Sequence, residues 1–98
     1  MSFAPLHDIR QHFIRQRIKI FIGVGHGGLD SGAVANNIVE KQVNLLVAFA
    51  LEAELKRHGF QVKLSRYGDE EDRLADEIAE CNAYGPDFAI EIHTNAGG

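Results

Sequence analysis

Three residues of this 98-residue sequence, His26, Glu40 and His93, have side chains that commonly bind metal ions in proteins. Two imidazoles and one carboxylate fill three positions around a tetrahedral zinc ion and leave the fourth open for water, a pattern typical of catalytic zinc sites. Zinc in such a site lowers the pKa of water towards about 7 and polarises a substrate carbonyl group. If the fold brings the three residues together, we expect a zinc-dependent hydrolytic site.

The elements that must position these residues follow from hydrophobic periodicity. The sequence predicts five elements, in the order strand, helix, strand, helix, strand: residues 18–24, 40–58, 60–64, 69–83 and 87–93. This order is typical of a three-layer α/β domain with a mostly parallel sheet and right-handed crossovers. The second strand alternates apolar and polar residues, which favours an edge position and a strand order of 2-1-3.

This topology predicts that the three candidate ligands share one edge of the sheet. His26 follows the first strand, His93 ends the third, and Glu40 opens the helix after the first strand. Ligands of open parallel sheets bind beyond the carboxyl ends of the strands, and neighbouring strands lie about 4.8 Å apart. Taken singly, each residue has an ordinary interpretation: a surface histidine, a glutamate favoured by the helix dipole, and a satisfied histidine at a strand end.

Glu91 is a fourth candidate, because it alternates onto the same strand face as His93. It could orient a metal ligand or take a proton during catalysis, and it could equally be a solvated or ion-paired residue. His58 lies near a helix C-terminus, where the helix dipole explains its presence.

Apolar spacing also predicts which helix faces are buried. In the first helix the predicted stripe comprises Val43, Leu46, Val47, Ala50, Leu51 and Leu55. In the second helix it comprises Leu74, Ala75, Ile78, Ala79 and Cys81. The acidic run Asp69 to Asp72 is expected to begin the second helix and to complement its dipole.

Length and charge restrict the domain organisation and the partners. We expect one domain over residues 18–98 and an N-terminal helical extension over residues 1–17, with Leu6, Ile9 and Phe13 at helical spacing. A net charge of -4 argues against nucleic-acid binding, and no apolar run approaches the roughly 20 residues of a membrane span. Basic residues interrupt the N-terminus, so we expect no signal peptide and cytoplasmic synthesis. The single cysteine, Cys81, excludes an intrachain disulfide.

Three segments carry a family resemblance: Gly25-His26-Gly27-Gly28-Leu29-Asp30-Ser31-Gly32-Ala33, Glu40-Lys41-Gln42-Val43-Asn44-Leu45 and Ile92-His93-Thr94-Asn95-Ala96. In order and spacing they resemble the zinc-dependent N-acetylmuramoyl-L-alanine amidases of the Amidase_3 type, found in bacterial autolysins and phage endolysins. The resemblance implies zinc bound by His26, Glu40 and His93. It also implies cleavage of the amide between the muramoyl lactyl group and the first alanine of the peptidoglycan stem peptide.

The sequence departs from the family pattern in three places. Gly23-Val24 stands where the family usually has Asp-Pro, and Leu74-Ala75-Asp76-Glu77 offers no match for an arginine early in the second helix. The family domain is longer, and its late catalytic glutamate has no counterpart here. We therefore expect a truncated domain with an apolar outer strand, which favours an oligomer or a complementing C-terminal half.

These observations favour a peptidoglycan hydrolase that acts at the bacterial cell wall through zinc-activated water. The first alternative is a non-catalytic fragment that binds zinc and cell wall, or a regulatory half of a split amidase. The second alternative is an α/β domain without a metal.

Overall fold

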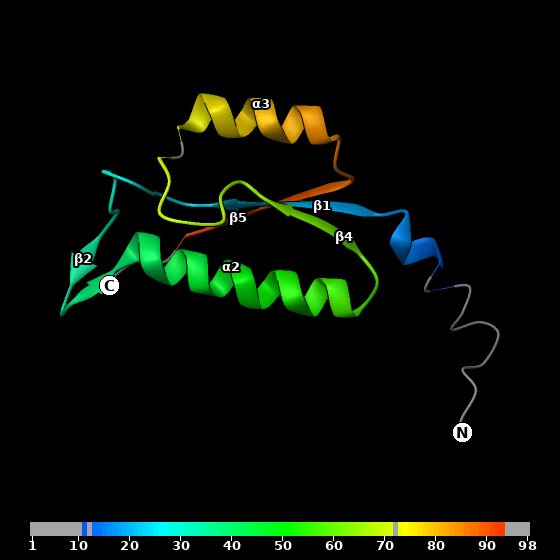
Figure 1. Cartoon of the computed structure of the whole chain (residues 1–98), viewed down its shortest axis with the longest axis horizontal. Helices are drawn as coiled ribbons and strands as arrows, with labels where there is room; N and C mark the ends of the chain where they lie inside the picture. The colour runs from blue at the N-terminus through cyan, green and yellow to red at the C-terminus, as the bar shows by residue number, and fades with distance from the viewer. Residues whose placement is uncertain (1–10, 12, 72, 94–98) are drawn as a thin grey trace, which may run out of the picture.

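A computed structural model of the chain describes residues 11, 13–71 and 73–93 as three layers, with two helices on opposite faces of one sheet (Figure 1). The elements are β1 (Lys19–Val24), β2 (Val34–Ala35), β3 (Ile38–Val39), α2 (Glu40–Arg57), β4 (Gln61–Leu64), α3 (Leu74–Tyr84) and β5 (Phe88–Ile92). The α/β class is therefore confirmed. Most of the predicted N-terminal extension, including Leu6 and Ile9, lies outside the described residues, and residues 13–16 are helical.

The main sheet is parallel and has the strand order β4-β1-β5, which confirms the predicted order 2-1-3. At its centre, Ile22 of β1 pairs with Leu64 of β4 on one side and with Ile90 of β5 on the other. At the carboxyl end, Val24 pairs with Ile92. The segments after β1 and β5, which carry His26 and His93, consequently leave the sheet side by side.

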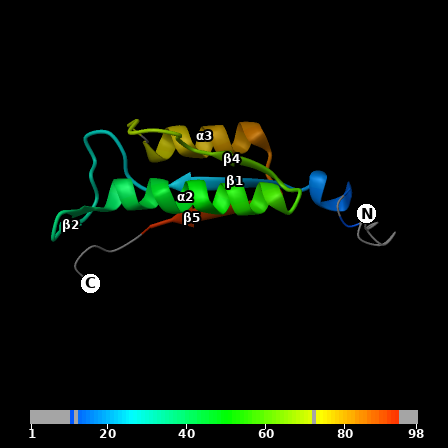
Figure 2. The same cartoon turned by 60° about the horizontal axis from the view of Figure 1, so that its bottom comes forward.

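The hydrophobic core lies between the sheet and α2. Every second residue of β1 contributes to it, since side chains alternate between the faces of a strand. Its buried members are Ile20, Ile22, Val24, Ala48, Leu64 and Ile92. In Figure 2, turned so that α2 comes forward, the helix runs beside β1 and β5. This packing fixes the start of α2, and with it Glu40, at the carboxyl end of the sheet.

The predicted apolar stripe of α2 is partly wrong. Leu46 and Val47 are 69% and 43% exposed, whereas Glu40, Asn44 and Ala48 are buried. The helix carries apolar residues on more than one face, and it is turned so that Glu40 and Asn44 face the end of the sheet. The rotation of α2 about its axis therefore follows the burial of Glu40 and Asn44 at the end of the sheet, and part of the apolar surface of the helix faces outward.

The predictions for the second helix also need correction. It begins at Leu74, not at Asp69, because Asp69 lies in a loop and accepts hydrogen bonds from Gly28 and Lys41. Leu74 and Ile78 are 70% and 51% exposed, while Glu77 is only 7% exposed. α3 stands off the sheet and leaves a cavity of about 160 Å³ between them, so its apolar residues line a space instead of filling a core.

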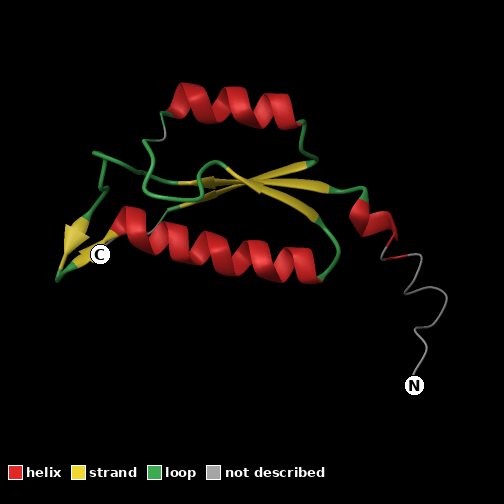
Figure 3. Ribbon diagram, viewed as in Figure 1, coloured by secondary structure: helices red, strands yellow, loops and turns green. Residues whose placement is uncertain are grey.

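The segment predicted as a loop before Glu40 contains a short hairpin formed by β2 and β3. Asn36 and Asn37 form its turn with φ angles of 51° and 64°, and asparagine tolerates this left-handed backbone better than most residues. Figure 3 shows the hairpin beyond the carboxyl ends of the main strands, where it leads directly into α2.

None of the helices in the described part of the chain combines the length and apolarity that a bilayer crossing needs.

Candidate metal centre

His26 lies in the loop that leaves β1, and its neighbours fix the orientation of its ring. Its Nδ1 atom lies 2.9 Å from Oδ2 of Asp30, and its Nε2 atom lies 3.2 Å from Oε1 of Glu40. The hydrogen bond with Asp30 is the main cause that raises the pKa of His26 above its ordinary value, and the charge of Glu40 adds to it. His26 has a φ angle of 64°, a backbone conformation that is uncommon for a residue with a side chain.

Glu40 is the first residue of α2, and its carboxylate is buried at 4% exposure. It accepts hydrogen bonds from the Ala33 amide at 3.1 Å and from Nδ2 of Asn44 at 3.4 Å. Asn44 lies one helical turn beyond Glu40, so both side chains share one face of α2. A buried carboxylate is stable only with compensating partners, and a cation between Glu40 and the two histidines would provide one.

His93 completes the group from the end of β5. Its Nδ1 atom lies 3.5 Å from Oε2 of Glu40, and its ring meets the ring of His26 edge-on at a centroid distance of 5.4 Å. On the other side, Nε2 lies 3.7 Å from Oε1 of Glu91. The structure therefore brings together all three residues that the sequence singled out as ligands, while their role in binding a metal stays a prediction.

The separations within this group suit a single ion. One candidate donor atom from each of His26, Glu40 and His93 can be chosen so that all lie within 4.8 Å of one another. Donors around tetrahedral zinc, at about 2.0–2.1 Å from the ion, are separated by about 3.3 Å. The contact of His26 with Oε1 of Glu40, at 3.2 Å, and the contact of His93 with Oε2, at 3.5 Å, are both close to this separation, so each histidine lies at a distance from the carboxylate that a shared zinc ion would require.

Two glycines keep space for these side chains. A Cβ atom at Gly25 would lie 2.6 Å from the His93 ring. At Gly32, which has a φ of +69°, a Cβ atom would lie 2.6 Å from Cδ2 of His26 and 2.8 Å from Oε1 of Glu40. All three separations are too short for non-bonded atoms, so a side chain at either position would displace a candidate ligand.

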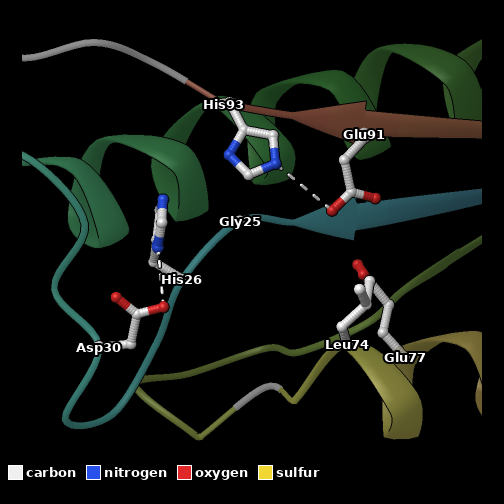
Figure 4. Close-up of a pocket in the computed structure, with 7 residues that line it drawn as sticks. All are labelled: Gly25, His26, Asp30, Leu74, Glu77, Glu91 and His93. Atoms are coloured by element: carbon white, nitrogen blue, oxygen red, sulfur yellow. Dashed lines mark hydrogen bonds and ion pairs between the residues drawn. The ribbon is translucent and has the colours of Figure 1, made fainter.

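A pocket of about 330 Å³ opens beside the three residues. Its lining comprises Gly25, His26, Asp30, Leu74, Glu77, Glu91 and His93 (Figure 4). Glu91 projects from β5 and Glu77 from α3, and the two carboxylates approach each other over Gly23. A Cβ atom at Gly23 would lie 1.9 Å from Oε2 of Glu91 and 2.2 Å from Oε1 of Glu77. The pocket therefore has His26, Asp30 and His93 at one end and the carboxylates of Glu91 and Glu77 at the other.

Sequence reasoning placed His26, Glu40, His93 and Glu91 at this edge, and it did not single out Asp30, Asn44 or Glu77. The spacing of four residues between Glu40 and Asn44 was an available signal, because it places both on one helix face. Glu77 gave no such signal, since an acidic residue in the first turn of a helix is expected to be solvated.

Fold and donor set together define a parallel α/β domain with a candidate metal centre open to a pocket at the carboxyl end of its sheet. A family model described as N-acetylmuramoyl-L-alanine amidase matches residues 20–98. The chain is 43% identical over 83 residues to N-acetylmuramoyl-L-alanine amidase CwlM of Bacillus licheniformis, covering 83% of this chain and 33% of that protein. It is 42% identical over 83 residues to a sporulation-specific N-acetylmuramoyl-L-alanine amidase of Bacillus subtilis, covering 83% and 32%.

Solved structures agree with these relatives. The catalytic domain of CwlV, an N-acetylmuramoyl-L-alanine amidase from Bacillus (Paenibacillus) polymyxa var. colistinus, superimposes with a TM-score of 0.76 at 30% identity. The match covers 83% of this chain and 48% of that chain. The chain belongs to the N-acetylmuramoyl-L-alanine amidase family. It spans about a third of the length of the two curated relatives.

Proposed function

We propose that this domain hydrolyses peptidoglycan at the amide between N-acetylmuramic acid and the L-alanine of the stem peptide, and that it acts at the bacterial cell wall. The observation that carries the proposal is the convergence of His26, Glu40 and His93 beside an open pocket. Family membership supports the choice of substrate, because the matching relatives are named for this amide.

We propose zinc as the metal, held by His26, Glu40 and His93. Two imidazole nitrogens and one carboxylate suit zinc better than magnesium or calcium, which prefer oxygen ligands. A bound zinc ion would supply Lewis acidity, which polarises an amide carbonyl and eases deprotonation of water. The pocket beside the three residues leaves room for a substrate on the side of Glu91 and Glu77.

Two further residues would orient a ligand and accept a proton. Asp30, through its contact with Nδ1 of His26, leaves Nε2 of that ring directed at Glu40 and so at the metal position. The family's late catalytic glutamate has no counterpart in this sequence, so we propose that, within this chain, Glu91, which lines the pocket, accepts a proton from the attacking water. Its carboxylate lies 3.7 Å from Nε2 of His93, beside the metal position.

Two measurements test the proposal. Zinc content after purification should approach one ion per chain and should fall sharply in His93→Ala, because losing one of three protein ligands opens the site. Incubation with purified peptidoglycan should release new amino termini in a zinc-dependent manner, and Glu91→Gln should release them more slowly at unchanged zinc content. A chain that binds zinc and cell wall without releasing amino termini would instead be the non-catalytic binding module. Zinc below about 0.2 per chain would refute the metal centre.

A further inference from the structure

A buried arginine, Arg66, contacts two segments that carry proposed ligands, the segment after β1 and the first turn of α2. It follows β4 and is 2% exposed. Its Nη2 atom donates to the carbonyl of Gly25 at 3.2 Å and to the carbonyl of Lys41 at 2.8 Å. Gly25 precedes His26 and Lys41 follows Glu40, so one guanidinium nitrogen joins the backbone next to two of the proposed ligands.

The loop after β4, which carries Arg66, makes a second connection to the same two segments through Asp69. Oδ1 of Asp69 accepts a hydrogen bond from the Gly28 amide at 2.9 Å, and Oδ2 accepts one from Nζ of Lys41 at 3.0 Å. Nζ of Lys41 also donates to the carbonyl of Gly28 at 2.7 Å. The segment after β1 and the start of α2 are therefore connected twice, once through Arg66 and once through Asp69.

The backbone of the segment after β1 is also in close contact with the backbone of the loop after β4. A Cβ atom at Gly27 would lie 2.1 Å from the carbonyl oxygen of Glu70, so only glycine lets the two loops approach this closely. Nη1 of Arg66 donates to the carbonyl of Gly68 at 2.8 Å, which holds the loop in the shape that presents Asp69.

We infer that residues 66–69 form a clamp that sets the distance between His26 and Glu40, and that Arg66 and Asp69 are positioning residues for metal binding. This inference rests on the proposed function, because it concerns affinity for the metal of that site. Neither residue is a ligand in the arrangement described. Their effect comes through the backbone, since a metal tolerates ligand displacements of only about 0.2 Å.

The geometry explains why arginine is needed here. A guanidinium presents donors in a rigid planar fork, which allows Arg66 to reach Gly25, Lys41 and Gly68 at once. An ammonium group is a compact donor on a flexible stem and cannot reproduce this arrangement. Arg66→Lys therefore keeps the charge and loses the connection between the two ligand-bearing segments.

The test measures zinc affinity by competition with a chromogenic chelator in the full chain. We expect Arg66→Lys to weaken zinc binding by about 10- to 100-fold, the range found when groups that support metal ligands are removed. Asp69→Asn should weaken it less, because the amide keeps the size of the side chain and loses its charge. The matched control is Arg73→Lys. The Arg73 side chain is 73% exposed and pairs with exposed Glu71, so this variant should bind zinc like the unmodified chain.

A spectroscopic measurement separates positioning from general support of the fold. Cobalt(II) in place of zinc gives an absorption spectrum that reports on the geometry of its ligands. The spectrum should change in Arg66→Lys. It should stay unchanged in Val62→Ala, a variant that loses packing on the core where β4 pairs with Ile20, near the start of β1. If Arg66→Lys does not fold, the exposed Asp69 offers the same test through Asp69→Asn.

The outcomes are distinct. Zinc affinity within twofold of the unmodified chain in both Arg66→Lys and Asp69→Asn, with an unchanged cobalt spectrum, would overturn the clamp and leave the proposed function intact. Failure of the unmodified chain to bind zinc would refute the metal centre itself.

Discussion

Replacing Gly32 with alanine should damage the metal centre more than the fold. Gly32 has a φ of +69°, and an added Cβ atom would lie 2.6 Å from His26 and 2.8 Å from Glu40. The substitution therefore has two effects of different kinds. One is a backbone strain that any residue with a side chain would suffer at this φ, and the other is a collision with two proposed ligands.

Both effects can be given a size. A left-handed backbone costs an L-residue about 1–2 kcal/mol, which for a domain of this length lowers the melting temperature by about 4–16 °C. The collision requires His26 or Glu40 to move by several tenths of an ångström, because contacts under 3.0 Å are not tolerated. This exceeds the roughly 0.2 Å that metal coordination allows, so we expect zinc affinity to fall by about 10- to 100-fold.

Gly85 provides the control. It ends α3 with a φ of +64°, and a Cβ atom there would meet nothing within 4 Å. Gly85→Ala should therefore lose a similar amount of stability in the presence of a chelator and keep its zinc affinity. Thermal melts with chelator and chelator-competition titrations of zinc measure the two quantities separately. Equal zinc affinity in Gly32→Ala and Gly85→Ala would refute the claim that a Cβ atom at Gly32 displaces His26 or Glu40.

Three further predictions concern other parts of the structure. Zinc at 100 times its dissociation constant should stabilise the unmodified chain by about 2.7 kcal/mol in urea unfolding, and Glu40→Gln should abolish most of this gain. The Lys41 ammonium and the Gly28 amide hold the pKa of Asp69 below its ordinary value, so its contribution to stability is present above about pH 4 and is lost as the pH falls further. Urea unfolding of Asp69→Asn should accordingly differ from the unmodified chain at pH 6 and converge with it in acid. Phe88 and Ile90 on the outer strand β5 are 61% and 38% exposed, so light scattering should show association that rises with concentration and weakens in Phe88→Lys; a monomer at high concentration would contradict this.

The sequence was sufficient for the topology and for the position of the proposed ligands. The three main strands are joined by one helix each, and few sheet topologies are compatible with this order. The alternation of apolar and polar residues in β4 indicated that this strand lies at an edge of the sheet. Since His26 and His93 each follow a strand, their positions are set by topology alone. Their approach to Glu40 could be predicted because α2 begins at Glu40, where the helical pattern of the sequence also begins.

The rotation of the helices was less predictable. In α2, apolar residues occur on several faces, and the choice among them depends on the burial of Glu40 and Asn44 at the site. In α3, Glu77 is buried beside the pocket although charged residues usually face water. The contacts of Arg66 were unpredictable for another reason. They involve backbone carbonyls, which every residue possesses and which leave no trace in side-chain identity.

The left-handed backbone at His26 has a consequence for how this protein would respond to selection. At a φ of 64°, the backbone of histidine is less stable than that of glycine by about 1 kcal/mol, and without a metal only the contacts of the ring with Asp30 and Glu40 offset this cost. A library of variants screened only for heat resistance, with no metal supplied, should therefore accept glycine at this position. The same library screened in the presence of zinc should restore histidine, so the position would report which of the two pressures had acted.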